Sequence, residues 1–401
     1  MSNATMDYED LRVTMTSSYD WKYNDKDTGC KYAVTFYHPQ SQGDLRPLGS
    51  IVLDNYNSAQ GKRATLLVGP NPDKSANPPV KAPTSFTWVW DDKGTGGKHA
   101  GTIWQPVAPA GYVAMGHVVT NNYNQPPTDV VWCLRADLVA PANFSAKNIW
   151  DDTKSGGKYD CSCWAVYPAP NNTKGSEDLP VLTDTFYAHR GYDTPAYSLA
   201  KTLKLRLTKQ YKSFDQVRPT MTEYMTPGEQ FNRMLQCSVK LPFVAFFPPT
   251  DEKCLRGIAT PFCTLSRYAS WTVEGAWKNH SHTPFEHEAS ITTGVTQEKS
   301  STLEHSAGVS ATASGGMGFV NFSISLNYQF TSSNTVTYGQ YQEETIKKKI
   351  AVPGGRGMAI LSKMVEMECD RPDGSSVRTT FPTKNDVTII DMVVDQSKLP
   401  N

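Results

Sequence analysis

The 401-residue chain has no net charge, because 39 Lys and Arg residues balance 39 Asp and Glu residues. Without a basic excess, the usual electrostatic basis for binding nucleic acid is missing. The chain also has no apolar run of the roughly 18 residues that a membrane-spanning helix needs. Its longest apolar run, residues 241–247, contains one proline and precedes two more, and we expect it to form a buried strand.

Several functional signatures are also missing. The first residues contain no apolar signal core, so no Sec-type signal peptide is predicted. The eight cysteines are scattered, and Cys161-Ser162-Cys163 has no second pair to complete a zinc site. There is no Gly-x-Ser-x-Gly motif and no phosphate-binding loop. We therefore expect buried thiols, and neither an enzyme, a cofactor nor a metal site.

One cluster of side chains offers an alternative to this view. It consists of His280, His282, Glu286, His287 and Glu288. A His-x-His pair on a strand places two imidazoles on one face, as a metal site requires. No third and fourth ligand can be assigned, and Pro284 favours a polar surface loop. A second alternative is that these histidines, with His305, respond to acid.

Charge is absent altogether from residues 306–342, although 19% of the chain is charged and these 37 residues should hold about seven charges (0.19 × 37). Ser, Thr, Asn, Gln and Gly fill half of this uncharged segment. Its apolar residues alternate with polar ones on both sides of a Gly-Gly-Met-Gly break. Period-two alternation around a glycine-rich break predicts a β-hairpin. The shift from odd to even positions fits a two-residue turn at Gly318-Phe319.

This hairpin has one apolar and one polar, uncharged face. The apolar, membrane-inserting set is Val309, Ala311, Ala313, Met317, Phe319, Val320, Phe322, Ile324, Leu326, Tyr328 and Phe330. The polar set, expected to face a water-filled lumen, is Ser310, Thr312, Ser314, Ser323, Ser325 and Asn327. A soluble hairpin would ordinarily carry Lys and Glu on its wet face.

The lengths of the two strands suit a bilayer. Residues 309–317 and 320–330 provide nine and eleven residues, which matches a transmembrane β-strand. Two strands alone would leave backbone groups unpaired in hydrocarbon. We therefore expect a homo-oligomer in which several copies close a barrel in a target-cell membrane, each inserting about residues 306–333. The alternative is a Ser/Thr-rich hairpin on an antiparallel sandwich.

The first half of the chain repeats itself. Trp90-Asp91-Asp92, Gly96-Gly97-Lys98 and Trp104 recur 60 positions later as Trp150-Asp151-Asp152, Gly156-Gly157-Lys158 and Trp164. An earlier copy, 67 positions upstream of the first of these, begins at Asp25. A constant offset over about 30 positions indicates duplication. Three such units predict a β-prism with a pseudo-threefold axis, with a β-trefoil as the alternative.

The repeated acidic and aromatic residues allow two interpretations. Asp side chains at glycine turns commonly hydrogen-bond the backbone, and tryptophans commonly fill a core. Alternatively, these side chains contact a receptor or glycan. The candidates for receptor binding are Asp91, Asp92, Trp104, Asp151, Asp152 and Trp164.

A family resemblance rests on residues 104–120. Here Trp104-Gln105-Pro106-Val107-Ala108-Pro109 precedes Gly111-Tyr112-Val113-Ala114-Met115-Gly116-His117-Val118-Val119-Thr120. This segment resembles the signature of the vacuolar-protein-sorting-sixty-two-like family of plants and fungi, with Met115 in place of the usual Leu. The resemblance covers about residues 20–195. It implies a β-prism similar to domains that bind glycans or receptors in insecticidal toxins and lectins.

The second half changes character after about residue 195. Leu203, Leu205 and Leu207 alternate with basic residues, and longer strands are expected around 268–274, 291–299 and 335–350. The order of long Ser/Thr-rich strands around an amphipathic hairpin resembles aerolysin-like toxins, including relatives of epsilon-toxin and mosquitocidal toxin. That resemblance implies an elongated form that assembles into a ring.

These observations combine into one hypothesis. We expect an all-β protein with a receptor- or glycan-binding β-prism at 1–195 and an aerolysin-like pore-forming domain at 196–401. The expected function is that of a secreted or released pore-forming toxin or defence protein, possessing no cofactor, that moves to a target-cell membrane. The alternative is a non-lytic, lectin-like carbohydrate-binding protein.

Overall fold

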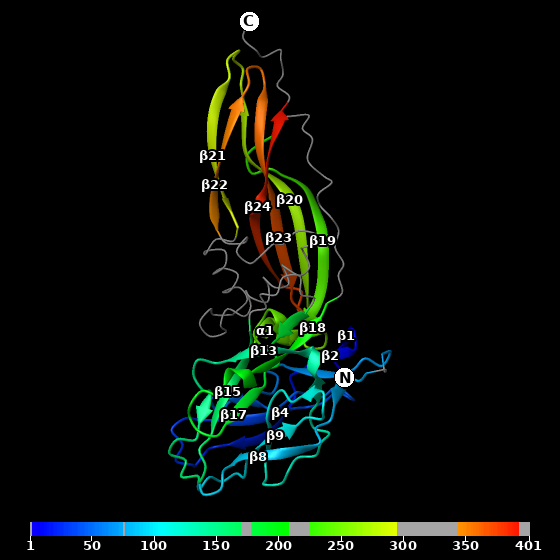
Figure 1. Ribbon diagram of the computed structural model, residues 1–401, viewed down its shortest axis with the longest axis vertical. Helices are drawn as coiled ribbons and strands as arrows, with labels where there is room; N and C mark the ends of the chain where they lie inside the picture. The colour runs from blue at the N-terminus through cyan, green and yellow to red at the C-terminus, as the bar shows by residue number, and fades with distance from the viewer. Residues whose placement is uncertain (1, 75–76, 170–177, 208–224, 295–342, 393–401) are drawn as a thin grey trace.

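The computed structural model describes residues 2–74, 77–169, 178–207, 225–294 and 343–392. The protein is nearly all β, with 51% strand and 5% helix, which confirms the predicted fold class. Figure 1 shows a compact first part, coloured blue to green, and an elongated second part built from long strands. No helix among the described residues is long and apolar enough to cross a membrane.

Each of the three repeats contains a set of three antiparallel strands. These sets are β3 (Tyr19–Asn24), β4 (Thr35–Pro39) and β5 (Ile51–Leu53); β8 (Ser85–Asp91), β9 (Thr102–Val107) and β11 (Val118–Thr120); and β14 (Trp150–Asp151), β15 (Ser162–Pro168) and β17 (Phe186–His189). The first two sets are separate sheets, whereas the third is part of a six-stranded sheet. The register is also shared. Tyr23 pairs with Phe36, Trp90 with Ile103, and Trp150 with Cys163, so one large aromatic side chain occupies the same place in each unit.

A second group of strands completes each unit. It comprises β1 (Met6–Tyr8), β2 (Leu11–Thr16) and β6 (Thr65–Pro70); β7 (Val80–Lys81), β12 (Cys133–Arg135) and β10 (Tyr112–Val113); and β13 (Val139–Phe144), β18 (Lys201–Arg206) and β16 (Asp178–Val181). In β18, Leu203 and Leu205 are buried, as their alternation predicts. This strand lies beyond residue 195, where the sequence places the end of the first domain, yet it pairs with β13 and β16.

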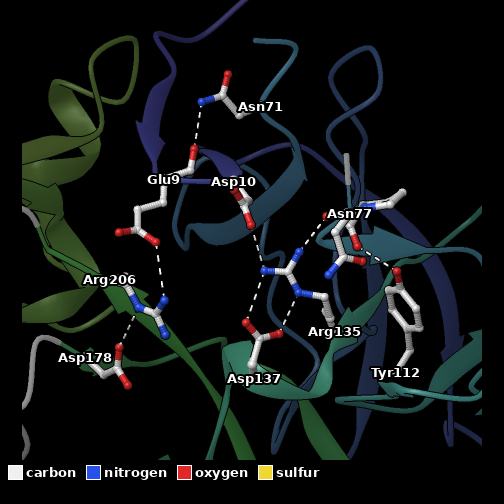
Figure 2. A network of polar contacts seen from close by, with 10 residues as sticks. Glu9, Asp10, Asn71, Asn77, Tyr112, Arg135, Asp137, Asp178 and Arg206 are labelled. Carbon is white, nitrogen blue, oxygen red and sulfur yellow. Dashed lines mark hydrogen bonds and ion pairs between the residues drawn. The ribbon is translucent and has the colours of Figure 1, made fainter. Parts of the chain in front are cut away.

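A network of ion pairs joins the three units (Figure 2). The Arg135 guanidinium bonds to Asp10 at 2.7 Å and to Asp137 at 2.6 Å. Arg206 lies 3.5 Å from Glu9 and 3.3 Å from Asp178. The turn that carries residues 9 and 10 belongs to the first unit, so the network ties that turn to the second and third units.

The elongated part is a four-stranded antiparallel sheet with a two-stranded ribbon beside it. The sheet has the order β19 (Gln230–Pro242), β20 (Phe262–Lys278), β23 (Gly357–Asp370) and β24 (Ser376–Met392). The ribbon pairs β21 (Phe285–Thr293) with β22 (Glu344–Val352). Figure 1 shows these strands running along the length of the second part.

The apolar run at 241–247 is buried, but the strand expected there is wrong beyond its first two residues. β19 ends at Pro242, and Phe243–Ala245 forms the 3-10 helix η3. The short helix α1 (Glu252–Arg256) follows, and the Asp251 side chain caps it by accepting from the Cys254 amide at 2.8 Å. Pro242 is the last residue of the strand, and it has no backbone N–H with which to extend the hydrogen bonding.

One hydrophobic core spans the junction of the two parts. It includes Leu66 and Leu203 from the first part together with Phe243, Val365 and Phe381 from the second. Hydrogen bonds reinforce the junction, including Ala64 N to the Pro249 carbonyl at 2.9 Å. The Tyr8 hydroxyl donates to the Lys240 carbonyl at 2.9 Å. Two smaller 3-10 helices, η1 (Ala136–Leu138) and η2 (Tyr197–Leu199), lie in the first part.

Candidate functional site

The residues of the predicted hairpin, 306–333, lie outside the described residues. The strands that lead into and out of this region are described, and they are neighbours. Thr293, near the end of β21, pairs with Glu344, the first residue of β22, and its hydroxyl donates to the Glu344 carbonyl at 3.1 Å. The chain therefore leaves and re-enters the described structure at two adjacent points, as a hairpin requires.

The β21–β22 ribbon is amphipathic. Ile291, Ile350 and Val352 are buried on one face, where they form a small cluster with Ile360 of β23. The opposite face is polar and exposed, and carries Glu288 opposite Lys349. The Lys347 ammonium lies 3.5 Å from the Glu288 carboxylate. Exposed ion pairs of this kind contribute little stability, so the small apolar cluster is the main described contact of the ribbon.

The histidine cluster is split between two surroundings. His280 and His282 are exposed in the loop before β21, and the imidazole of His287 lies 4.5 Å from the Trp277 ring. In the described part of the chain, no three His, Cys, Asp or Glu side chains are grouped closely enough to hold a metal ion. His305 lies outside the described residues, so an acid response of the whole cluster stays a prediction.

Seven cysteines in the described part of the chain are free thiols, and six of them are buried. Burial raises the pKa of Cys133 to about 12, which suppresses the thiolate form that oxidation requires.

Three turns of the first part, one from each repeat, meet one another. They are residues 25–32, 92–99 and 152–160, between the first two strands of each repeat. Lys31 N donates to the Thr153 carbonyl at 3.1 Å, and the Lys98 ammonium lies 2.9 Å from the Asp27 carboxylate. A β-carbon at Gly29 would collide with the Lys154 carbonyl oxygen. Only glycine allows the turns to approach so closely.

A carboxylate stabilises each turn in the same way. Asp25, Asp92 and Asp152 are buried, and each accepts a hydrogen bond from the backbone amide nine residues later, at 2.8 to 2.9 Å. Trp90 Nε1 donates to Asp152 at 2.9 Å, and Trp150 Nε1 donates to Asp25 at 3.1 Å. Each of these two carboxylates therefore holds its own turn and an indole from another repeat.

The third bond of this kind is not formed. Tyr23 occupies the tryptophan position in the first repeat and is 1% exposed, and its hydroxyl has no hydrogen-bond partner among the described residues. Burial raises the pKa of Tyr23, and the nearby Asp92 carboxylate raises it further. The Tyr23 hydroxyl thus lies near Asp92, the equivalent carboxylate of the next repeat, without a hydrogen bond to it.

The other predicted receptor-binding residues also have partners within the chain. Asp91 accepts from Trp88 Nε1 at 3.2 Å, and Asp151 accepts from Asn148 Nδ2 at 3.0 Å. Two buried indoles complete the set: Trp104 donates to Thr120, and Trp164 donates to Ser162, at 3.0 and 2.9 Å. Each of the six predicted side chains thus contributes to the fold, and ligand contact by them stays a prediction.

Three exposed tyrosines lie over the buried carboxylates, and sequence reasoning did not select them. Tyr56, Tyr123 and Tyr192 are 44, 43 and 41% exposed. Tyr192 donates to Asp152 at 3.0 Å. Burial and a hydrogen bond to Asp25 raise the pKa of Tyr56 to about 12, and Tyr123 has the same relation to Asp92.

The signal for two of these tyrosines was present in the repeat. Asn55-Tyr56-Asn57 matches Asn122-Tyr123-Asn124 at the 67-residue offset. We call the three turns and the three tyrosine loops, 54–57, 121–124 and 190–193, the apex. It presents three related combinations of an aromatic ring, a buried carboxylate and nearby lysines.

Comparisons with known proteins bear on the first part most directly. The family model described as vacuolar protein sorting-associated protein 62 (Vps62) matches residues 1–239, more than half of the chain. A search of curated proteins gives no match.

Two solved structures are similar to this chain. One is the crystal structure of GNIP1Aa from Chromobacterium piscinae, with 21% identity and a TM-score of 0.38, covering 46% of this chain and 34% of that one. The other is the crystal structure of Cry35Ab1, with 10% identity and a TM-score of 0.31, covering 96% and 90%. This chain thus spans about a third of the length of GNIP1Aa. The family match includes the motif at 104–120 and all three repeats, and the chain belongs to the Vps62 family.

Proposed function

We propose that the protein is a β-pore-forming toxin or defence protein. Its first part binds a cell-surface receptor, copies of the chain assemble, and each copy contributes the hairpin at about 306–333 to a transmembrane barrel. Binding to a surface raises the effective concentration for assembly. Closure of the barrel then pairs the backbone groups that a partly inserted strand would leave unsatisfied.

The observation that carries this proposal is the uncharged, alternating segment together with the strands that flank it. Charge is expensive on the lipid-facing side of a barrel and is tolerated at the water interface. The charges resume at Glu343 and Glu344, where β22 begins. The β21–β22 ribbon that flanks the uncharged segment has few buried side chains. Because moving elements come from the less stable parts of a fold, this small burial favours release of the uncharged segment.

Dye release tests this proposal. The full chain is added to liposomes and to candidate target cells, with and without prior protease treatment, and escape of a trapped dye is measured. Release accompanied by ring-shaped oligomers is expected. Stable surface binding without any release under all of these conditions would contradict pore formation.

A second candidate is a non-lytic, lectin-like carbohydrate-binding protein. The observation that favours it is the threefold display of exposed tyrosines at the apex, since aromatic rings provide large contact area at low entropic cost. Binding to a glycan array without leakage from liposomes or cells would support this alternative.

A further inference from the structure

Exposed aromatic side chains gather around the apex. Six of the described large exposed side chains belong to its turns and loops or contact them: Trp21, Tyr32, Tyr56, Tyr123, Tyr159 and Tyr192. Trp21 contacts the ring of His99 in the second turn at 4.9 Å, and Trp88 contacts Tyr159 in the third at the same distance. An aromatic residue of the first repeat thus touches the turn of the second, and one of the second touches the turn of the third.

The exposed charge of the apex is mainly positive. Six exposed lysines, two from each turn, are Lys26, Lys31, Lys93, Lys98, Lys154 and Lys158. The tyrosine loops add the exposed Arg190, while the exposed carboxylates are Asp27, Asp54, Asp160 and Asp193. Seven cations against four anions leave an exposed excess of three positive charges in a chain that is neutral overall.

The lysines lie across the aromatic rings. The Lys26 ammonium is 4.8 Å from the Tyr56 ring centre, and that of Lys93 is 4.4 Å from Tyr123. Lys158 lies 5.2 Å from its neighbour Tyr159. A lysine stem along an aromatic ring joins apolar area to a charged end, and aromatic and basic residues of this kind are enriched at membrane–water interfaces.

The same contacts disfavour sugar binding at these positions. Stacking of a sugar needs a free ring face, and the lysines already cover one face of several tyrosines. Carboxylates that could accept from sugar hydroxyls are also engaged. Asp152 accepts from Trp90, from Tyr192 and from the Cys161 amide. Lys98 and Lys93 pair with Asp27 and Asp91 at 2.9 and 3.6 Å. The other exposed ammonium groups of the apex favour an anion.

We propose that the apex docks on the anionic lipid headgroups of a target membrane. The lysine ammonium groups meet headgroup phosphates and carboxylates, and the tyrosine and tryptophan rings lie among the headgroups. Three related sites around one axis make contact together, so that weak individual contacts add. This inference names the partner of the receptor-binding step in the proposed function and rests on that function.

Vesicle co-sedimentation of the full chain provides the test. Phosphatidylcholine vesicles are compared with vesicles that also contain phosphatidylserine. We expect binding that requires phosphatidylserine and weakens with added salt. The combined variant Lys26→Gln, Lys93→Gln and Lys158→Gln removes one exposed charge from each repeat. Each lysine near an anionic surface contributes about fivefold, so the combined loss should be about 100-fold.

The matched control removes three exposed lysines remote from the apex, Lys62→Gln, Lys74→Gln and Lys253→Gln, and should bind as the parent protein does. A second apex variant, Tyr32→Ser, removes an exposed ring whose centre lies 4.9 Å from the Lys31 ammonium. It should weaken binding several-fold while the circular dichroism spectrum is unchanged.

Three outcomes would overturn the inference. They are equal binding to both vesicle types, equal binding by the apex and control variants, and retention on heparin that the apex variant loses without any vesicle binding. The last outcome would assign the apex to acidic glycans. Dye release from the same vesicles separates the two proposals. If binding depends on the apex lysines but no dye is released, the pore proposal is contradicted. If the apex variant releases as much dye as the parent protein, only the docking proposal is contradicted.

Discussion

The indole of Trp90 donates a 2.9 Å hydrogen bond to the carboxylate of Asp152, which lies in the following repeat. The bond lies within a buried core of the first part, where the centres of the Trp90 and Trp150 rings are 5.5 Å apart. Burial raises the pKa of Asp152, although hydrogen bonds from the Cys161 amide and Trp90 oppose this effect. The indole therefore helps to keep a buried carboxylate ionised while it holds two repeats together.

Replacing this donor should destabilise the first part. Trp90→Phe keeps most of the ring but removes the N–H, so one hydrogen bond to a buried carboxylate is lost. We expect the free energy of unfolding to fall by about 1–3 kcal/mol in urea titration. Trp104→Phe is the matched control, because Trp104 donates to a Thr120 hydroxyl beside solvent, and should cost less. Equal losses in the two variants would contradict a special role for the bond between repeats.

Stability should fall as the pH is lowered from about 6.5 to 4. Burial lowers the pKa of His38 and His117 from 6.5 to about 4. In that window the unfolded chain binds more protons than the folded chain, so acid favours unfolding. Each histidine contributes about 3 kcal/mol of stability that is present above pH 6.5 and lost on the way to pH 4. Thermal unfolding at several pH values measures the effect.

Variants identify the source of this pH dependence. His38→Gln or His117→Gln should flatten the curve between pH 6.5 and 4 while lowering stability at neutral pH. The exposed His287 serves as the control, and His287→Gln should leave the slope unchanged. An unchanged slope in both buried variants would assign the acid sensitivity to other groups.

Arginine on the predicted lipid-facing side of the hairpin should abolish leakage. Ile324→Arg or Leu326→Arg places a charge at the bilayer midplane, which costs roughly 2–4 kcal/mol in each subunit of the ring. Dye release should be lost while vesicle binding persists. Ser325→Lys, one position away, should preserve leakage and shift ion selectivity in single-channel recordings. If both kinds of variant behave alike, the assignment of the two faces is wrong.

A covalent lock at the base of the ribbon should block pore formation reversibly. Gly294 N, just after the end of β21, donates to the Pro382 carbonyl of β24 at 2.8 Å, so the two backbones lie close together there. Thr293→Cys with Pro382→Cys should suppress dye release when oxidised, and reductant should restore it. The single-cysteine variants serve as controls. Full leakage from a completely oxidised double variant would show that the ribbon need not separate from the sheet.

The sequence predicted the all-β class and the three repeats because Asp, Gly and aromatic residues mark local turns at fixed spacing. The interpretation of Asp92 and Asp152 was harder, because Trp90, the indole partner of Asp152, comes from a different repeat and no local pattern reveals it. The position of Tyr192 could not be predicted for another reason. It follows Tyr123 by 69 positions and lies in a Gly-Tyr-Asp sequence, so neither the 60-residue offset nor the Asn-Tyr-Asn pattern finds it.

The remaining features could not be predicted because they depend on pairing between strands that are distant in the chain. The strand β18 belongs to the first part because it pairs with β13 and β16. The alternation of Leu203 and Leu205 predicts that one face is buried, but it does not identify the strands with which β18 pairs. The run at 241–247 was correctly expected to be buried, since apolar residues require cover. Its turn into a 3-10 helix begins directly after Pro242, where Phe243 joins the shared core at the junction.

The Tyr23 hydroxyl, which has no hydrogen-bond partner among the described residues, bears on how the three repeats are held together. The hydrogen bond between buried groups is missing between the first and second repeats, which the polypeptide already connects in sequence. The joint between the third and first repeats, which are distant in the chain, keeps its bond from Trp150 to Asp25. The repeats that lack this bond are therefore the two that follow each other in the chain, whereas the two that are distant in the chain are joined by a hydrogen bond between buried groups.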